Sequence, residues 1–249
     1  RSAGAETFSS TTTTPFTLHL SRASALENAG ICLHPLYGFA YLPGSGLKGM
    51  ARAYAETVWM PEENQEQAQK QINEIFGASD SDRELSSGNI VFHDAWPEEW
   101  PSLIVDIVNN HHKDYYQADD DNHPPGDWEA PNPVYFLAVK PGTMFSFPLS
   151  NRRADVADDL LTLARQWLLG ALCHLGAGAK TNAGYGAFKP TEGTSPTLPT
   201  QRRVVFETTL ELITPAFLAG ADQYGATAEE GCTLRPATLR GHLRWWWRT

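Results

Sequence analysis

Residues 43–52 of this chain read Pro43-Gly44-Ser45-Gly46-Leu47-Lys48-Gly49-Met50-Ala51-Arg52. The stretch predicts the start of a helix near Ser45, because apolar residues recur at helical spacing from Leu47 to Val58 and Pro61 then ends the pattern. A helix start presents free backbone N–H groups and the positive end of the helix dipole, which attract anions. Lys48 and Arg52, four positions apart, share one helical face. The candidate phosphate contacts here are Gly44, Ser45, Gly46, Lys48 and Arg52.

The pattern L-[K/R]-G-x-x-R of residues 47–52 recurs at residues 239–244. A proline precedes each copy, and aromatic residues follow each copy. Recurrence predicts two modules built on one template. The end of the chain, from Arg235 to Thr249, has four arginines and no acid, so we expect polyanion contacts there at Arg235, Arg240 and Arg244. The alternative for either copy is a set of surface residues whose aliphatic stems cover the core.

A glycine-rich loop, residues 176–186, is predicted to follow a long helix over residues 154–175. Glycine lets backbone N–H groups approach a phosphate closely, and the lysine of the loop would add charge. A Walker A loop would need glycine where His174 and Ala179 stand, which disfavours nucleotide hydrolysis. A mobile loop that only caps the helix is the alternative. The candidate contacts of the loop are Gly176, Gly178, Lys180, Thr181, Asn182, Gly184 and Tyr185.

Charge is distributed unevenly along the 249 residues, whose net charge is −10. Residues 53–130 carry 18 acidic and three basic side chains, so the rest of the chain is mildly basic. An overall acidic balance argues against coating nucleic acid through net charge. We expect any polyanion site to lie outside the acidic segment.

The order of predicted elements gives an α+β fold of ferredoxin-like or RRM-like order. Strands are expected at residues 16–20, 31–42, 88–95, 134–139, 143–149 and 204–212, and helices at 45–58, 62–76 and 154–175. The expected organisation is an N-terminal tail (1–15), a domain (16–189) with an acidic, partly helical insertion at about 59–130, a linker (190–203) and an incomplete second module (204–249).

Residues 111–116 are dense in functional side chains, with Asp106 nearby. A metal site or a general-base histidine is one interpretation, and polar surface residues at a helix-to-loop junction are the other. The three cysteines are far apart and form no CxxC pair, so neither a zinc ribbon nor a disulfide framework is suggested, and we expect no cofactor. With no apolar leader or long apolar run, the expected location is the cytoplasm, without membrane contact.

The glycine motifs of residues 43–49 and 176–186 resemble the RAMP superfamily of CRISPR effector proteins. The first module, roughly residues 16–188, is similar to the sixth subunit of the Cmr (type III-B) complex in residues 33–38, 111–116 and 136–143. Residues 214–222, 234–236 and 239–248 are similar to the beginning of the first Cmr subunit, which implies a fusion of two neighbours. Gly46 stands where serine is commoner, and the second module lacks a glycine loop.

The resemblance implies a non-catalytic subunit that binds CRISPR guide RNA towards its 3′ end, beside target RNA and the other Cmr subunits. RNA or partner contacts are expected at His34, His111, His112, Lys113 and Tyr115. Two alternatives remain open. A metal-independent guide-processing RNA endonuclease would use His34, His111 or His112 as a base. A scaffold that touches only proteins would fit the acidic segment, and salt-dependent RNA binding would exclude it.

Overall fold

The computed structural model describes residues 5–18, 31, 33–60, 64–78, 86–110, 112, 115, 117, 129–193, 195, 196, 209, 211 and 213. The helices are α1 (Gly44–Tyr54), its π-helical continuation η1 (Ala55–Trp59), α2 (Gln65–Phe76), α4 (Asp158–His174) and the short 3₁₀ turn η2 (Thr181–Ala183). The strands are β1 (Ala5–Thr12), β2 (Gly77–Ala78), β3 (Ser86–Ser87), β4 (Ile90–Phe92), β5 (Trp96–Pro97), β6 (Leu103–Asn110), β7 (Asn132–Val139), β8 (Met144–Asn151) and β9 (Phe188–Pro190).

The main sheet has the strand order β4-β8-β1-β9, with β5 also pairing with β8. All of its pairs are antiparallel. With α1 between β1 and β4, and α4 between β8 and β9, the chain follows the β-α-β-β-α-β order of ferredoxin-like folds. The predicted α+β fold class is therefore confirmed.

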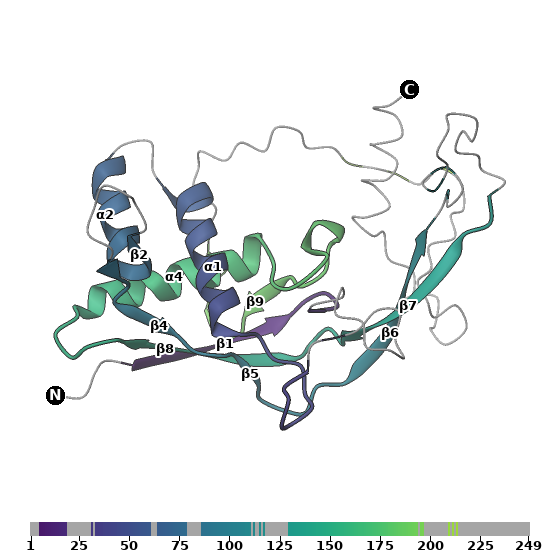
Figure 1. The fold of residues 1–249 in the computed structure, drawn as a ribbon, viewed down its shortest axis with the longest axis horizontal. Coiled ribbons are helices and arrows are strands. Elements are labelled where there is room, and N and C mark those ends of the chain that lie inside the picture. Colours follow the sequence, from purple (N-terminus) through teal and green to yellow (C-terminus); the bar gives the residue numbers. More distant parts are fainter. Residues whose placement is uncertain are drawn as a thin grey trace.

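Helices α1, α2 and α4 cover one face of the main sheet (Figure 1). The core lies between these two layers, where alternate residues of β8, among them Phe145 and Phe147, meet Trp167 and Leu168 of α4. Helices α1 and α4 pack closely at Gly170, where an added Cβ would lie 2.3 Å from the Tyr54 ring. The packing of the two layers sets the positions in space of the start of α1 and the end of α4. Both of these helix ends belong to the candidate site.

Strands β6 and β7 form a separate two-stranded ribbon that extends beyond the end of the main sheet (Figure 1). The ribbon is antiparallel and pairs Leu103 with Val139 at its base. Val139 also exchanges backbone hydrogen bonds with Phe16, which joins the ribbon to the body of the domain. Strand β6 was not predicted, because it lies in the acidic segment assigned to an insertion.

The prediction of an N-terminal tail is wrong for residues 5–12. These residues form β1, which lies inside the sheet between β8 and β9. Its buried side chains alternate, but two of them are the small polar residues Ser10 and Thr12, so the stretch did not resemble a strand. The predicted strand at 16–20 is likewise reduced, in the described residues, to the single bridge between Phe16 and Val139.

The described part of the predicted insertion at about 59–130 is integrated into the core of the domain. Helix α2 buries Ile72, Ile75 and Phe76 in the main core, and β4 pairs with β8. Among the described acids of the segment, Glu66 is on the exposed face of α2, whose other face is apolar, whereas Asp106 is buried in β6. The helices predicted at 45–58, 62–76 and 154–175 are confirmed within a few residues, and the predicted strand at 31–42 is a loop with the isolated bridges Leu33–Ala40 and Leu42–Ala95.

Candidate nucleic-acid interface

The start of α1 and the glycine-rich loop form opposite walls of one groove of about 760 Å³. The walls come from residues 43–50 and residues 175–181, which are far apart in the sequence. The residues that line the groove are Leu18, Leu42, Pro43, Ser45, Gly46, Leu47, Met50, Leu175, Gly176, Ala177, Gly178, Ala179 and Thr181. The structure thus brings together parts of both predicted glycine motifs.

The first turn of α1 is fixed to the sheet by Asp94 and β4. The Gly44 N–H donates to the Asp94 carboxylate at 2.7 Å, so a carboxylate of the protein already occupies part of the anion-binding helix start. A Cβ on Gly44 would lie 2.2 Å from the carbonyl oxygen of Phe92. Gly44 is therefore required by the close approach of α1 to β4, and its contact with Asp94 was not foreseen from sequence spacing.

Gly46 and Gly49 differ from Gly44 because nothing lies within 4 Å of the place a Cβ would occupy on either residue. Both are exposed, and Gly46 lines the groove. A glycine inside a helix costs about 1 kcal/mol relative to alanine. Among the described residues, no packing contact requires glycine at either position.

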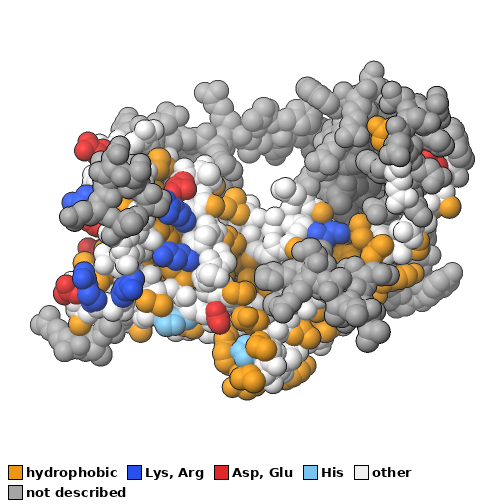
Figure 2. Space-filling model, viewed as in Figure 1, with side chains coloured by type: hydrophobic (Ala, Val, Ile, Leu, Met, Phe, Trp, Pro, Cys, Tyr) orange, Lys and Arg blue, Asp and Glu red, His pale blue; other side chains and the backbone are white. Residues whose placement is uncertain are grey.

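Lys48 and Arg52 lie on the other side of α1 from the groove. Each is two positions from the groove-lining Met50, and two positions turn a helix by about 200°. The Arg52 guanidinium also pairs with the Glu56 carboxylate at 2.7 Å. Figure 2 shows Lys and Arg side chains gathered on the side of the molecule that carries α1 and α2. Arg52 is in the last turn of α1, away from the free N–H groups of the helix start.

The glycines of the loop are surrounded by the protein's own chain. Gly178 has φ +86°, and a Cβ there would lie 2.3 Å from the Thr17 carbonyl oxygen. At Gly186 the added Cβ would lie 1.8 Å from the Ala177 carbonyl oxygen. Gly176, with φ +74°, caps the C-terminal end of α4 as predicted. These glycines are required by the fold of the loop.

Most backbone N–H groups of the loop are used inside the protein. Those that donate to backbone carbonyls are the N–H groups of Gly176, Ala177, Ala179, Ala183, Gly184, Tyr185 and Gly186. The predicted cradle of free loop N–H groups is therefore smaller than the sequence suggested. Thr181, which lines the groove, belongs to the remaining central part of the loop.

Lys180 and Tyr185 connect the loop to the β6–β7 ribbon. The Lys180 ammonium lies 4.6 Å from the centre of the Phe136 ring and 5.6 Å from that of Tyr185. The Tyr185 hydroxyl donates to the carboxylate of Asp106, which is buried in β6. Neither Asp106 nor Phe136 was predicted to belong with the loop, because β6, the strand that pairs with β7 in the ribbon, was not predicted.

The described histidine candidates, His34 and His112, are not among the residues that line the groove. The Nδ1 atom of His34 accepts the N–H groups of Leu36 and Tyr37 at 3.3 and 3.4 Å, which orients the ring within a cluster of aromatic side chains. His112 lies 3.4 Å from the Glu129 carboxylate, and Tyr115 is exposed. Outside the described residues lie His111, Lys113, Arg235, Arg240 and Arg244.

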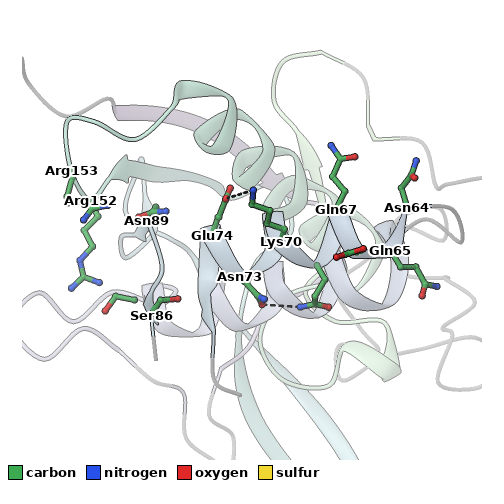
Figure 3. Close-up of a pocket in the computed structure, with 13 residues that line it drawn as sticks. Asn64, Gln65, Gln67, Lys70, Asn73, Glu74, Ser86, Asn89, Arg152 and Arg153 are labelled. Atoms are coloured by element: carbon green, nitrogen blue, oxygen red, sulfur yellow. Dashed lines mark hydrogen bonds and ion pairs between the residues drawn. The ribbon is translucent and has the colours of Figure 1, made fainter. Parts of the chain in front are cut away.

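A larger, polar groove of about 1340 Å³ runs along α2 (Figure 3). Gln69 and Asn73 share a 3.0 Å hydrogen bond on the lining face of α2, and Lys70 pairs with Glu74 at 4.0 Å. Arg152 and Arg153 lie across from them at the end of β8. No sequence motif pointed to this groove, whose lining carries both signs of charge.

The described residues contain neither a candidate membrane span nor a candidate metal site. No helix among them combines the length and apolar character that a membrane span requires. Within the same residues, no group of three or more His, Cys, Asp or Glu side chains is arranged to hold a metal ion.

Comparison with known families matches residues 11–189 to the model of the RAMP superfamily. The chain belongs to the RAMP superfamily. It is 36% identical over 118 residues to the CRISPR system Cmr subunit Cmr6 of Pyrococcus furiosus, a match that covers 45% of this chain and 32% of that protein. It is 26% identical over 172 residues to the Cmr6 subunit of Saccharolobus solfataricus, covering 68% of this chain and 51% of the relative. This RAMP chain thus spans between a third and about half of the length of these curated relatives.

Among solved structures, the RAMP chain is similar to one in a cryo-EM structure of the type III-B Cmr-beta complex bound to cognate target RNA. That similarity has a TM-score of 0.54 and 24% identity, and covers 76% of this chain and 58% of the other. At this identity the likeness supports the fold. These matches do not confirm the predicted fusion with the first Cmr subunit, which stays a prediction for residues outside the described part.

Proposed function

We propose that this RAMP protein is a non-catalytic, RNA-binding subunit of a type III-B CRISPR complex, and that the guide RNA backbone, towards its 3′ end, passes through the groove between α1 and the glycine loop. The observation that carries the proposal is the groove itself, which joins two glycine motifs more than a hundred positions apart in the sequence. Similarity to Cmr6 subunits supports the assignment to such a complex.

The chemistry of the groove favours contact with the sugar-phosphate backbone over reading of bases. Ser45 and Thr181 provide hydroxyl groups on opposite walls, and Gly46 leaves room for a chain to approach the helix backbone. No charged residue is among the described residues that line the groove. Binding there is expected to be independent of sequence and to depend on salt only through neighbouring charges such as Lys180.

The endonuclease alternative gains no support from the described histidines. His34 uses Nδ1 to accept backbone N–H groups, and its ring is packed among aromatic side chains outside the groove. A general base must reach the proton that it removes within hydrogen-bonding distance. We propose that RNA cleavage, where it occurs in the complex, is performed by another subunit.

The test is RNA binding by the full chain with the groove blocked. Gly46→Leu places a large side chain in open space on α1, where leucine also favours the helix. Gln67→Leu on the exposed face of α2 is the matched control. We expect Gly46→Leu to weaken binding of a labelled 20-nucleotide single strand by at least about tenfold, a loss of roughly 1.4 kcal/mol, and the control to bind as the wild type does.

Cleavage is measured in the same samples by denaturing gel. Equal affinity of both variants for the RNA would show that the groove is not the binding site. RNA cutting that disappears in His34→Ala would replace the binding proposal with the endonuclease alternative.

A further inference from the structure

An exposed group of apolar side chains lies outside both grooves, where residues 33–39 meet residues 96–100. We call this group the aromatic patch, and it consists of the exposed residues Leu33, Leu36, Tyr37, Trp96 and Trp100 together with the half-buried Phe39. The loop of residues 33–39 projects from the edge of the sheet at the bottom of Figure 1, and Figure 2 shows hydrophobic side chains gathered in the same place. The patch therefore forms a distinct surface of the domain.

The aromatic patch is held in a fixed shape before any partner binds. Trp96 lies 5.6 Å from both Tyr37 and Phe39, measured between ring centres, and Phe39 meets Trp100 edge-on at 5.8 Å. The loop is closed by two 2.8 Å backbone hydrogen bonds, from the His34 N–H to Phe39 and from the Gly38 N–H to His34. A fixed surface of this kind loses little side-chain entropy on binding.

The side chains of the patch remain in contact with solvent despite this order. Leu36 is 83% exposed, Trp100 71% and Tyr37 52%. Contiguous exposed apolar residues mark interaction sites in soluble proteins, and tryptophan and tyrosine are frequent at the centres of protein interfaces. The exposure of several large side chains together indicates a surface that a partner covers.

The charges around the patch select the kind of partner. Residues 33–42 and 93–102 contain Asp94, Glu98 and Glu99 and no lysine or arginine. Lys140, beside Trp100 in a neighbouring pocket, is one cation against these three carboxylates. Phosphate groups of RNA would be repelled by this excess of negative charge. A protein surface with basic residues around an apolar centre would be attracted.

We propose that the aromatic patch binds another protein subunit of the complex, through an apolar face bordered by lysine or arginine. This inference rests on the proposed function, since it takes the partner from the same type III-B assembly. The patch and the groove are separate surfaces, so that protein docking and RNA binding are lost through different substitutions.

The experiment co-expresses the full chain with the remaining protein subunits of its type III-B complex and purifies the assembly through a tag on another subunit. Leu36→Ser with Trp100→Ser is the test variant, chosen because both side chains are largely exposed and their loss leaves the melting temperature nearly unchanged. Tyr135→Ser, at a 59% exposed position on β7, is the matched control. Affinity for a labelled 20-nucleotide single-stranded RNA is measured for each protein.

We expect recovery of the double variant with the complex to fall at least about tenfold, while its RNA affinity and the recovery of the control stay within about twofold of wild type. Reduced RNA affinity of the double variant would overturn the proposal in favour of a base-stacking surface. Unchanged recovery, or an equal loss in the control, would also overturn it. If the wild-type chain itself fails to join the complex, the proposed function fails and this inference falls with it.

Discussion

The two walls of the groove use glycine for opposite reasons. In the loop wall, Gly178 is surrounded so closely by the chain that a Cβ would lie 2.3 Å from a backbone oxygen, and Gly186 further along the loop is as crowded, at 1.8 Å. In the helix wall, no described atom lies within 4 Å of a Cβ at Gly46, and the same is true at Gly49, outside the groove lining. A shared residue type therefore does not imply a shared role. The loop glycines build the wall, and the helix glycines leave room beside it.

The largest predicted effect is on the loop wall, for Gly178→Ala. The substitution places a side chain against Thr17 and Phe16 and also requires a positive φ from a residue with a Cβ. We expect the free energy of unfolding to fall by about 3 kcal/mol. Gly142→Ala is the control, because Gly142 has φ +89° but open space around it, and about 1 kcal/mol is expected there. Equal losses of unfolding free energy for the two variants in urea melts would show that the crowding around Gly178 makes no contribution.

The second prediction compares two glycines within α1. Gly44→Ala pushes a methyl group against the Phe92 carbonyl, and we expect a loss of about 2 kcal/mol in the free energy of unfolding. Gly46→Ala, two residues further on, should gain up to about 1 kcal/mol. Thermal melts of the two variants measure the difference, and a gain in Gly44→Ala would show that the packing of α1 on β4 is looser than described.

The third prediction concerns the contact between the loop wall and the ribbon. Tyr185→Phe removes the hydrogen bond to the buried Asp106 carboxylate, and we expect about 1 to 2 kcal/mol of destabilisation. Tyr135→Phe, at an exposed position of the same ribbon, should change the free energy of unfolding by less than about 0.5 kcal/mol. No difference between the variants would mean that the contact does not hold the loop.

The smallest effect is expected for the basic residues on the far side of α1. Lys48→Ala with Arg52→Ala should change the slope of log affinity against log salt by less than about 0.7, the value for one single-strand phosphate contact. Lys180→Ala in the loop should change the slope by about that amount. A drop of one unit or more in the double variant would place RNA on the outer face of α1, as the helical pattern alone suggested.

The sequence carried enough information for the helices and the strands β7 and β8, because their apolar periodicity is set by burial against one core. Strand β1 was missed because its buried positions include Ser10 and Thr12, and β6 because its acidic surroundings suggested an insertion. Both motifs of the groove were found from glycine spacing. The different roles of these glycines could not be predicted, because only the tertiary structure shows which atoms a Cβ at each position would contact.

Asp94 and Asp106 make contacts of the site that also could not be predicted from the sequence. Each contacts a residue far away in the chain, Gly44 and Tyr185 respectively, through strand pairings that no local pattern predicts. The contacts that fix the geometry of the groove could therefore not be predicted from the sequence. The two motifs that supply the residues of the groove could be predicted.

The most direct test of the account is Gly46→Ala, measured for both stability and RNA binding, with Gly49→Ala outside the groove lining as its control. Each alanine in an open helical position should raise the free energy of unfolding by up to about 1 kcal/mol. The methyl group at position 46 should also weaken RNA binding by at least about tenfold if the RNA backbone lies against this part of the helix. A more stable protein that binds RNA less well is the predicted result for Gly46→Ala. A more stable Gly46→Ala protein with unchanged RNA affinity would contradict the claim that Gly46 is there for RNA.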